Sequence, residues 1–224
     1  MAPYFCQALF LAPPIPTPIF ESIRVYDFDP KLPRRSTPIT GKTELEEDGS
    51  NLAIVLKNII ESDEERRKFS NLVRDVLSFV DSFKTEKFMD KSIIFTMREK
   101  YYETYLPASL LSDDTISLIS LIIALYFDKR PLVVFEEPGR NVHPSLIAKV
   151  VSMMKEVSDH RQVIVTTHSP QIVKYADLEA LLLVSRNEQG FSTVSRPADR
   201  EDVKTFLEND IGVADLFAQG LLES

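Results

Sequence analysis

Apolar residues recur at helical spacing in two segments of the first half of the chain. These segments run from Ser50 to Glu61 and from Phe69 to Phe83, and the second has apolar side chains every three or four residues along one face. The pattern predicts two amphipathic helices, joined by the charged run ESDEERRK, which is typical of a solvated helix surface. Residues 1–40 are rich in proline, which predicts extended or loop structure with little regular helix.

The second half of the chain alternates strand-like apolar runs with helical periodicity. Ile, Phe, Thr and Tyr dominate residues 91–97 and 101–106, which predicts a hairpin. Four alternating elements follow: a helix from Ser112 to about Phe127, a strand from Pro131 to Phe135, a helix from Pro144 to Val157 and a strand from Gln162 to Thr167. This order predicts a parallel βαβ unit. Two further strands and two short helices are expected, at Ala180–Ser185, Phe191–Ser195, Arg200–Leu207 and Val213–Ala218.

Composition narrows the classes of protein to consider. The chain has 224 residues, 44% of them apolar, which suits one globular domain with an appendage. Its formal net charge of −8 gives no global electrostatic reason to expect tight binding to nucleic acid or to an anionic membrane surface. We interpret the most basic short runs as ordinary solvated charges: Arg34, Arg35, Arg66, Arg67 and Lys68.

The cysteine count and the apolar segments bear on location. A single cysteine, Cys6, excludes an intrachain disulfide and suits a reducing compartment, so we expect a cytoplasmic protein. The apolar start of the chain lacks a basic region and is interrupted by prolines, which is unlike a signal helix. The longest apolar run, Ile116 to Phe127, is far shorter than the roughly 20 residues that span a bilayer. No membrane association is expected.

Two adjacent carboxylates end the apolar strand predicted before Pro138. Glu136 and Glu137 directly follow Leu132-Val133-Val134-Phe135, and the carboxyl edge of a parallel sheet is where α/β proteins bind ligands. Two like charges in a partly desolvated site are costly unless a cation or a water molecule meets them. Magnesium would meet that need, although the two residues could also simply open a surface loop.

A second predicted strand ends in a histidine. Val163 to Thr167 is followed by His168, and two parallel strands would bring Glu137 and His168 to one edge of the sheet. A lone histidine at a strand end is commonly structural. Following a carboxylate-bearing strand at βαβ spacing, however, His168 favours a functional site.

The segment Leu111-Ser112-Asp113-Asp114-Thr115 directly precedes the most apolar helix. Serine, aspartate and threonine are good N-cap residues, so ordinary helix capping accounts for much of this pattern. The same geometry offers an alternative, because exposed backbone N–H groups and the helix dipole at an N-terminus can bind a phosphate.

In this order, these segments resemble the ABC-type ATPases of the SMC and RecF kind, particularly the OLD-like AAA/ABC ATPases of prokaryotes. The resemblance identifies a signature motif at Leu111–Thr115, a Walker B strand at Leu132–Glu137, a D-loop at Gly139–Pro144 and a switch histidine at His168. It extends to the flanking segments 48–52 and 211–216 and covers roughly residues 23–224.

The resemblance implies a mechanism that depends on ATP and Mg²⁺. Glu136 would hold the magnesium ion through water, Glu137 would polarise the attacking water, and His168 would sense or position the γ-phosphate. Four residues would contact nucleotide: Ser112, Asp113, Thr115 and Asn141. Because Ser112 would reach ATP bound on a partner subunit, the resemblance implies a homodimer or a P-loop-bearing partner segment. DNA is a possible partner by resemblance only.

The predicted fold is α/β, the C-terminal part of a P-loop NTPase of the ABC type with a parallel βαβ core and a helical and hairpin N-terminal portion. Four parts are expected: an irregular proline-rich arm at 1–40, a helical and hairpin subdomain at 41–105, the ATPase core half at 106–196, and a helical tail at 197–224.

The sequence departs from the family pattern most clearly in its P-loop. A P-loop needs G-x-x-x-x-G-K-[ST] between a strand and a helix. The run Gly41-Lys42-Thr43 has Ser36 at the first glycine position, Pro38 within the loop and acidic residues after it. We therefore expect this chain to lack its own Walker A motif and to need the missing N-terminal half or a partner.

Two departures within the site leave other functions open. Glu136 replaces the usual aspartate, and Asp114 stands where the signature usually has glycine, adding negative charge beside a phosphate. A non-catalytic cassette-fold module for interaction or dimerisation is therefore the alternative. A metallohydrolase that uses Glu136, Glu137 and His168 is a third interpretation, weakened because His143 and His160 are not at ligand spacing with them.

Overall fold

Three parallel strands form the sheet that supports the candidate site. The computed structural model describes residues 22–89, 91–203 and 212–219. In it, the strands β1 (Ile23–Tyr26), β6 (Leu132–Glu136) and β7 (Gln162–Thr166) lie in the order β1-β6-β7. Helix α6 (Ile147–Ser158) connects β6 to β7, so the predicted parallel βαβ unit is confirmed. Strand β1 was not predicted, because its four residues are too few to stand out in a proline-rich segment.

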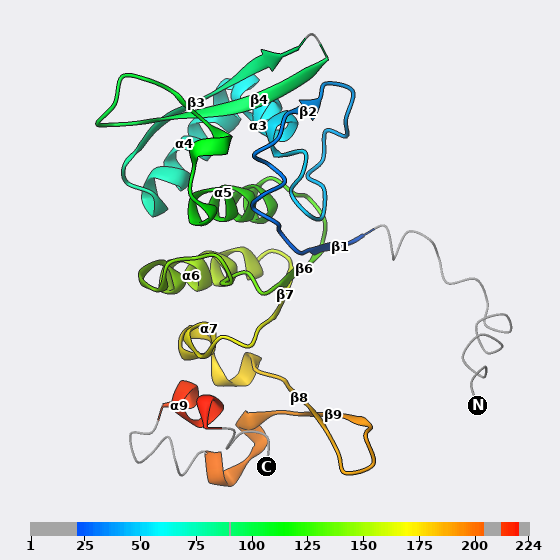
Figure 1. Ribbon diagram of the computed structural model, residues 1–224. Helices are drawn as coiled ribbons and strands as arrows, with labels where there is room; N and C mark the ends of the chain where they lie inside the picture. The colour runs from blue at the N-terminus through cyan, green and yellow to red at the C-terminus, as the bar shows by residue number, and fades with distance from the viewer. Residues whose placement is uncertain (1–21, 90, 204–211, 220–224) are drawn as a thin grey trace, which may run out of the picture.

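The helices cover one face of this sheet. Helices α5 (Asp113–Tyr126), α6 and α7 (Pro170–Tyr175) all lie on the same side of it (Figure 1). Tyr26 and Phe135 face these helices and are almost completely buried. Helix α5 is buried on nearly every side, from Thr115 to Leu125, because it lies between the sheet layer and the helices α3 and α4. Its apolar sequence is therefore that of a core helix.

The opposite face of the sheet is open in the described part of the chain. Side chains alternate along a strand, so Val25, Val134 and Ile164, which are opposite one another in register, share this outer face. Val25 is 39% exposed and Ile164 is 40% exposed. Parallel sheets normally have both faces covered, so a one-sided parallel sheet leaves β-branched apolar side chains in water.

A second layer combines two helices with an antiparallel sheet. The helices are α3 (Leu52–Glu61) and α4 (Asp63–Val76), and the strands are β2 (Thr37–Pro38), β3 (Val80–Phe88), β4 (Ser92–Glu99) and β5 (Leu106–Pro107). Four short 3₁₀ helices lie elsewhere, at Ala108–Leu110, Pro144–Leu146, Leu178–Ala180 and Pro197–Asp199.

The predicted hairpin of residues 91–97 with 101–106 is confirmed only at Met97 and Leu106, which pair antiparallel, and the strand expected over 101–105 is absent. Strand β4 pairs along its length with β3, and only Leu106 and Pro107 return to it as β5. The helix expected up to Phe83 ends instead at Val76, because Val80 and Phe83 bury their side chains from a strand. Helical and strand spacing coincide over so short an apolar run.

The C-terminal part has a small apolar cluster around Val203 and Leu216, and its helix packs against α7. Strands β8 (Leu183–Arg186) and β9 (Ser192–Ser195) form the two expected strands, and helix α9 (Val213–Ala218) lies where a short helix was predicted. The helix expected near Arg200–Leu207 falls partly outside the described residues. Within the described residues, no helix is long and apolar enough to cross a membrane.

A buried asparagine organises the loop that contacts the chain directly after β1. Asn51 donates to the carbonyls of Lys42 at 2.9 Å and Glu44 at 2.7 Å, and accepts from the backbone N–H of Glu46 at 2.8 Å. The N–H of Asp27 in turn donates to the Glu47 carbonyl at 3.0 Å. The loop organised by Asn51 is therefore bonded to the chain directly after β1.

Arg161 joins the end of α5 to the start of β7. Its guanidinium donates to the carbonyls of Ala124 at 2.7 Å, Asp128 at 2.7 Å and Arg130 at 3.4 Å, and also to that of Leu125. Carbonyls at the end of a helix have no partner within it, so Arg161 satisfies groups that would otherwise be orphaned.

Candidate functional site

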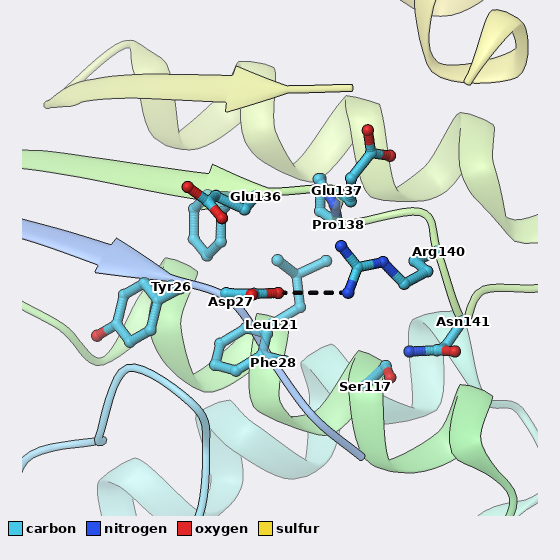
Figure 2. A pocket seen from close by; sticks show the side chains of 11 residues that line it. Tyr26, Asp27, Phe28, Ser117, Leu121, Glu136, Glu137, Pro138, Arg140 and Asn141 are labelled. Carbon is cyan, nitrogen blue, oxygen red and sulfur yellow. Dashed lines mark ion pairs between the residues drawn. The ribbon is translucent and has the colours of Figure 1, made fainter. Parts of the chain in front are cut away.

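Glu136 and Glu137 line a pocket at the carboxyl ends of β1 and β6. The pocket has an empty volume of ≈ 350 Å³ and opens to solvent. Figure 2 shows its side chains, which come from the end of β1, the face of α5 and the loop after β6. Its members are Tyr26, Asp27, Phe28, Ser117, Leu121, Phe135, Glu136, Glu137, Pro138, Arg140 and Asn141. This is the sheet edge at which the sequence predicts ligand binding.

Glu137 joins the ends of β6 and β7. Its Oε1 accepts a hydrogen bond from the backbone N–H of His168 at 2.6 Å, and its Oε2 accepts one from the Thr167 hydroxyl at 3.3 Å. The N–H of Glu137 donates to the Thr166 carbonyl at 3.0 Å. The structure thus brings Glu137 and His168 together, as the strand order predicts.

The backbone of Glu137 is strained. Its φ angle is 43°, in the left-handed region that residues other than glycine rarely occupy. The following loop is tightly packed, because a Cβ at Gly139 would lie 2.9 Å from Cδ1 of Ile172. Strained backbone of this kind persists only where surrounding contacts enforce it, and it clusters at functional sites.

The two adjacent carboxylates point apart (Figure 2). Glu137 is directed toward β7, whereas Glu136 is exposed on the outer, open face of the sheet. Continuing the strand register by one residue places Asp27 beside Glu136. Asp27 also forms an ion pair with Arg140, 3.5 Å between Oδ1 and Nη1. The pocket therefore contains a cation and more than one carboxylate.

Sequence reasoning missed Asp27, Arg140 and Ser117 as site residues. Asp27 directly follows the short apolar run of β1, which is the signal that could have found it. Arg140 belongs to the D-loop segment, but its pairing with Asp27 depends on a contact far apart in the sequence. Ser117 lies on α5 with 7% of its surface exposed, and its hydroxyl has no hydrogen-bond partner among the described residues.

The signature residues gather at the start of α5 and do not line this pocket. The Ser112 hydroxyl accepts a hydrogen bond from the backbone N–H of Thr115 at 3.2 Å and lies 2.9 Å from the Thr115 hydroxyl. Ser112 is thus the N-cap of α5. Asp113 forms an ion pair with Arg34. Of the four nucleotide-contact candidates, only Asn141 lines the pocket.

The Gly41-Lys42-Thr43 run lies in the loop organised by Asn51. The Lys42 ammonium pairs with Glu46 at 3.2 Å, and its side chain is 70% exposed. The next helix, α3, begins only at Leu52, and the preceding strand β2 has two residues. This arrangement differs from the strand, tight loop and helix of a P-loop.

Comparison with known proteins identifies the family. Residues 15–174 match the family model described as "AAA domain, putative AbiEii toxin, Type IV TA system". The chain belongs to this AAA domain family. Its members are nucleotide-binding ATPases, so the predicted resemblance to the AAA/ABC ATPases is confirmed. No curated protein sequence matches the chain.

Solved structures show the same fold. One solved structure, described as "Structural biochemistry of ATP-driven dimerization and DNA stimulated activation of SMC ATPases", aligns with a TM-score of 0.52 and 17% identity. The alignment covers 71% of this chain and 98% of that chain. The SMC head domains of Pyrococcus yayanosii and Thermotoga maritima align at TM-scores of 0.48 and 0.46, with 18% and 17% identity. They cover 65% and 78% of this chain, which spans 29% and 53% of theirs. The predicted α/β fold of the P-loop NTPase type is confirmed.

The AAA domain match encloses every candidate site residue. It runs from before β1 to the end of α7, and so includes the signature segment, Glu136, Glu137, Asn141 and His168. Strands β8 and β9 and helix α9 lie beyond it. The pocket is therefore a feature of the AAA domain and independent of the C-terminal part.

Proposed function

We propose that this chain is the Walker B half of an ABC-type ATPase of the SMC/RecF/OLD-like group, and that a separate P-loop segment completes it. In this proposal Glu137 polarises the attacking water, His168 contacts the γ-phosphate, and Ser112, Asp113, Thr115 and Asn141 contact nucleotide. Residues 106–196 are the core half, to which residues 23–28 add strand β1 and part of the pocket, and the subdomain 41–105 and the tail 197–224 flank it.

The observation that carries the proposal is the open edge of β7. Directly after β1, the Asp27 N–H donates to the Glu47 carbonyl and the Asp29 N–H donates to the Asp48 carbonyl at 3.2 Å, and Arg24 of β1 forms ion pairs with Glu44 and Glu47. In the described residues no strand pairs with β7 on the side away from β6. An unpaired edge beside an uncovered apolar face is a place for further strands and helices. The missing segment would lie there, next to Glu137 and His168.

The carboxylates fit a magnesium ion that arrives with a nucleotide. Mg²⁺ is usually held by one or two carboxylates together with waters and phosphate oxygens. Glu136 is exposed on the open face and meets this requirement, and the ion would supply charge neutralisation at the phosphates. Among the described residues, no group of three or more His, Cys, Asp or Glu side chains is arranged to hold a metal.

Within this proposal the main role of the chain's own residues is to hold the catalytic groups and the attacking water in place. The bond from the His168 N–H holds the Glu137 carboxylate at the junction of β6 and β7. A carboxylate there can accept a hydrogen bond from a water molecule and orient it for attack. Ser112 lies outside the pocket, which supports contact with nucleotide on an opposing subunit. From the family resemblance, we also propose a homodimer, and DNA as a partner.

Reconstitution tests the proposal. The full chain is expressed alone and together with any G-x-x-x-x-G-K-[ST] segment encoded directly upstream, and binding of Mg–ATP and release of phosphate are measured. We expect no ATP binding by the chain alone and magnesium-dependent hydrolysis by the pair. Tight binding by the chain alone that is lost in Lys42→Ala would instead make Gly41-Lys42-Thr43 a working P-loop.

A non-catalytic interaction module is the second candidate. It is favoured by Asp114, whose negative charge stands at the N-terminus of α5, and by the longer side chain of Glu136. Formation of a stable complex with the P-loop segment that binds ATP without hydrolysing it would support this function over the first.

A further inference from the structure

Arg34 belongs to the signature segment in space, although it lies far from it in sequence. Its Nη2 donates to the Leu111 carbonyl at 2.8 Å and to the Asp113 carboxylate. The Arg34 side chain is 29% exposed, whereas the neighbouring Arg35 is exposed and has no side-chain contact in the described part of the chain. The interpretation of Arg34 as an ordinary solvated charge was therefore wrong. A guanidinium can reach two acceptors across a fold in a way that no sequence pattern reveals.

These two contacts fix the entry to α5. The Leu111 carbonyl and the Asp113 carboxylate lie on either side of Ser112, so one guanidinium ties the backbone before the N-cap to the first residue of the helix. Ser112 then has its hydroxyl turned toward Thr115. Charge-assisted hydrogen bonds are roughly twice as strong as neutral ones, so the contacts of Arg34 should contribute substantially to holding this turn.

The same contact alters the charge at the N-terminus of α5. Asp113 and Asp114 place two carboxylates where an approaching phosphate would meet negative charge. Because Arg34 lies against Asp113, the pair is close to neutral, and the backbone N–H groups and helix dipole can again attract an anion. Arg34 therefore reduces the negative charge at this helix start to that of Asp114.

We propose that Arg34 is a positioning residue, which orients the Ser112 turn and neutralises Asp113 so that the signature can receive a nucleotide phosphate. The proposal rests on the proposed ATPase function. The two proposals can be tested separately, because the effect of Arg34 on the Ser112 turn can be measured in the full chain without nucleotide or partner.

The first measurement is hydrogen exchange, in the full chain, of the backbone amides of Thr115 and Ile116, which donate to the Ser112 hydroxyl and the Ser112 carbonyl. Arg34→Met removes both contacts and should speed their exchange about tenfold, the effect expected for one or two charge-assisted hydrogen bonds. Arg35→Met is the matched control and should leave exchange unchanged. Arg34→Lys keeps the charge but replaces the planar guanidinium, whose Nη2 makes both contacts, so its exchange should lie between the two. Unchanged exchange in Arg34→Met would overturn the proposal.

The second measurement is ATP turnover by the reconstituted pair. Arg34→Met should lower kcat about tenfold with KM little changed, because the Ser112 turn acts on nucleotide in the reacting complex. Adding Asp113→Asn to Arg34→Met should recover part of kcat if charge neutralisation is a cause, which a purely structural role would not produce. A loss confined to KM would contradict the role. If the unaltered pair hydrolyses no ATP, the ATPase function fails, and hydrogen exchange still decides whether Arg34 positions the turn.

Discussion

The Glu137 carboxylate accepts a hydrogen bond of 2.6 Å from the backbone N–H of His168. This contact links the residue after β6 to the second residue after β7, and the Glu137 N–H donates to the Thr166 carbonyl across the same junction. A displacement of either strand end would therefore move both candidate catalytic residues. Glu137 also has its strained φ angle here. Contacts at the junction of β6 and β7 therefore enforce a backbone conformation that glutamate does not prefer.

We expect Glu137→Gln to lower ATP turnover by the reconstituted pair at least 100-fold, because an amide cannot act as the base, a contribution typically of about 10²–10⁴-fold. The amide oxygen can still accept from the His168 N–H, so assembly should persist. Phosphate release measures turnover, and gel filtration measures assembly. Glu103→Gln, an exposed position remote in sequence from the pocket, is the control. Turnover equal to that of the unaltered protein would rule out Glu137 as the catalytic base.

A second prediction concerns pH and Asp128. Burial would raise the pKa of Asp128, but hydrogen bonds from Tyr26, at 2.5 Å, and from Arg130 hold that pKa below its usual value of 3.8. A lowered folded-state pKa stabilises the protein above the unfolded-state value, and this stability is lost as the pH falls through the folded-state value. We expect the free energy of unfolding to be steady above about pH 5 and to fall below about pH 4.

Urea unfolding between pH 3 and pH 7 tests this. Asp128→Asn should lower the free energy of unfolding at pH 7 by about 1–3 kcal/mol, because its buried partners lose a charged acceptor. It should also flatten the fall below pH 4. Asp159→Asn is the control at an exposed carboxylate. A pH profile identical in Asp128→Asn and the unaltered protein would mean that other carboxylates dominate acid unfolding.

Sequence pattern was sufficient where an element is long or its carboxyl end is marked by charge. The apolar run at β6 ends in Glu136, and α6 separates it from β7, so the parallel unit and the sheet edge that carries the pocket could be predicted. Strand β1 could not, because four residues among prolines show no clear period. The Arg34–Asp113 and Asp27–Arg140 pairs join segments distant in the chain, and spacing alone does not encode such contacts.

Arg161 is expected to be important for stability. Arg161→Met keeps part of the apolar stem but leaves the carbonyls of Ala124 and Leu125 without a donor. Loss of several hydrogen bonds from a charged group should lower the free energy of unfolding by about 2–4 kcal/mol. Urea unfolding at neutral pH provides the measurement. Arg186→Met, at an exposed position on β8, should change it by less than about 0.5 kcal/mol. Equal effects of the two substitutions would mean that the carbonyls find other partners.

The open face of the sheet gives a prediction that separates stability from assembly. Ile164 lies on that face of β7 and is 40% exposed, so Ile164→Lys in the chain alone should change the free energy of unfolding by no more than about 0.5 kcal/mol. If a P-loop segment packs against this face, the same lysine would be buried without a partner and should prevent complex formation.

Co-purification with the P-loop segment measures this effect. Val194→Lys, at a 64% exposed position on the β8–β9 hairpin, is the matched control, and it should assemble normally because that hairpin pairs with neither β6 nor β7. Assembly of Ile164→Lys at the level of the control would mean that the completing segment lies elsewhere. Failure of both variants would extend the interface to the hairpin. Loss in Ile164→Lys alone would locate the interface at β7, directly beside Glu137 and His168.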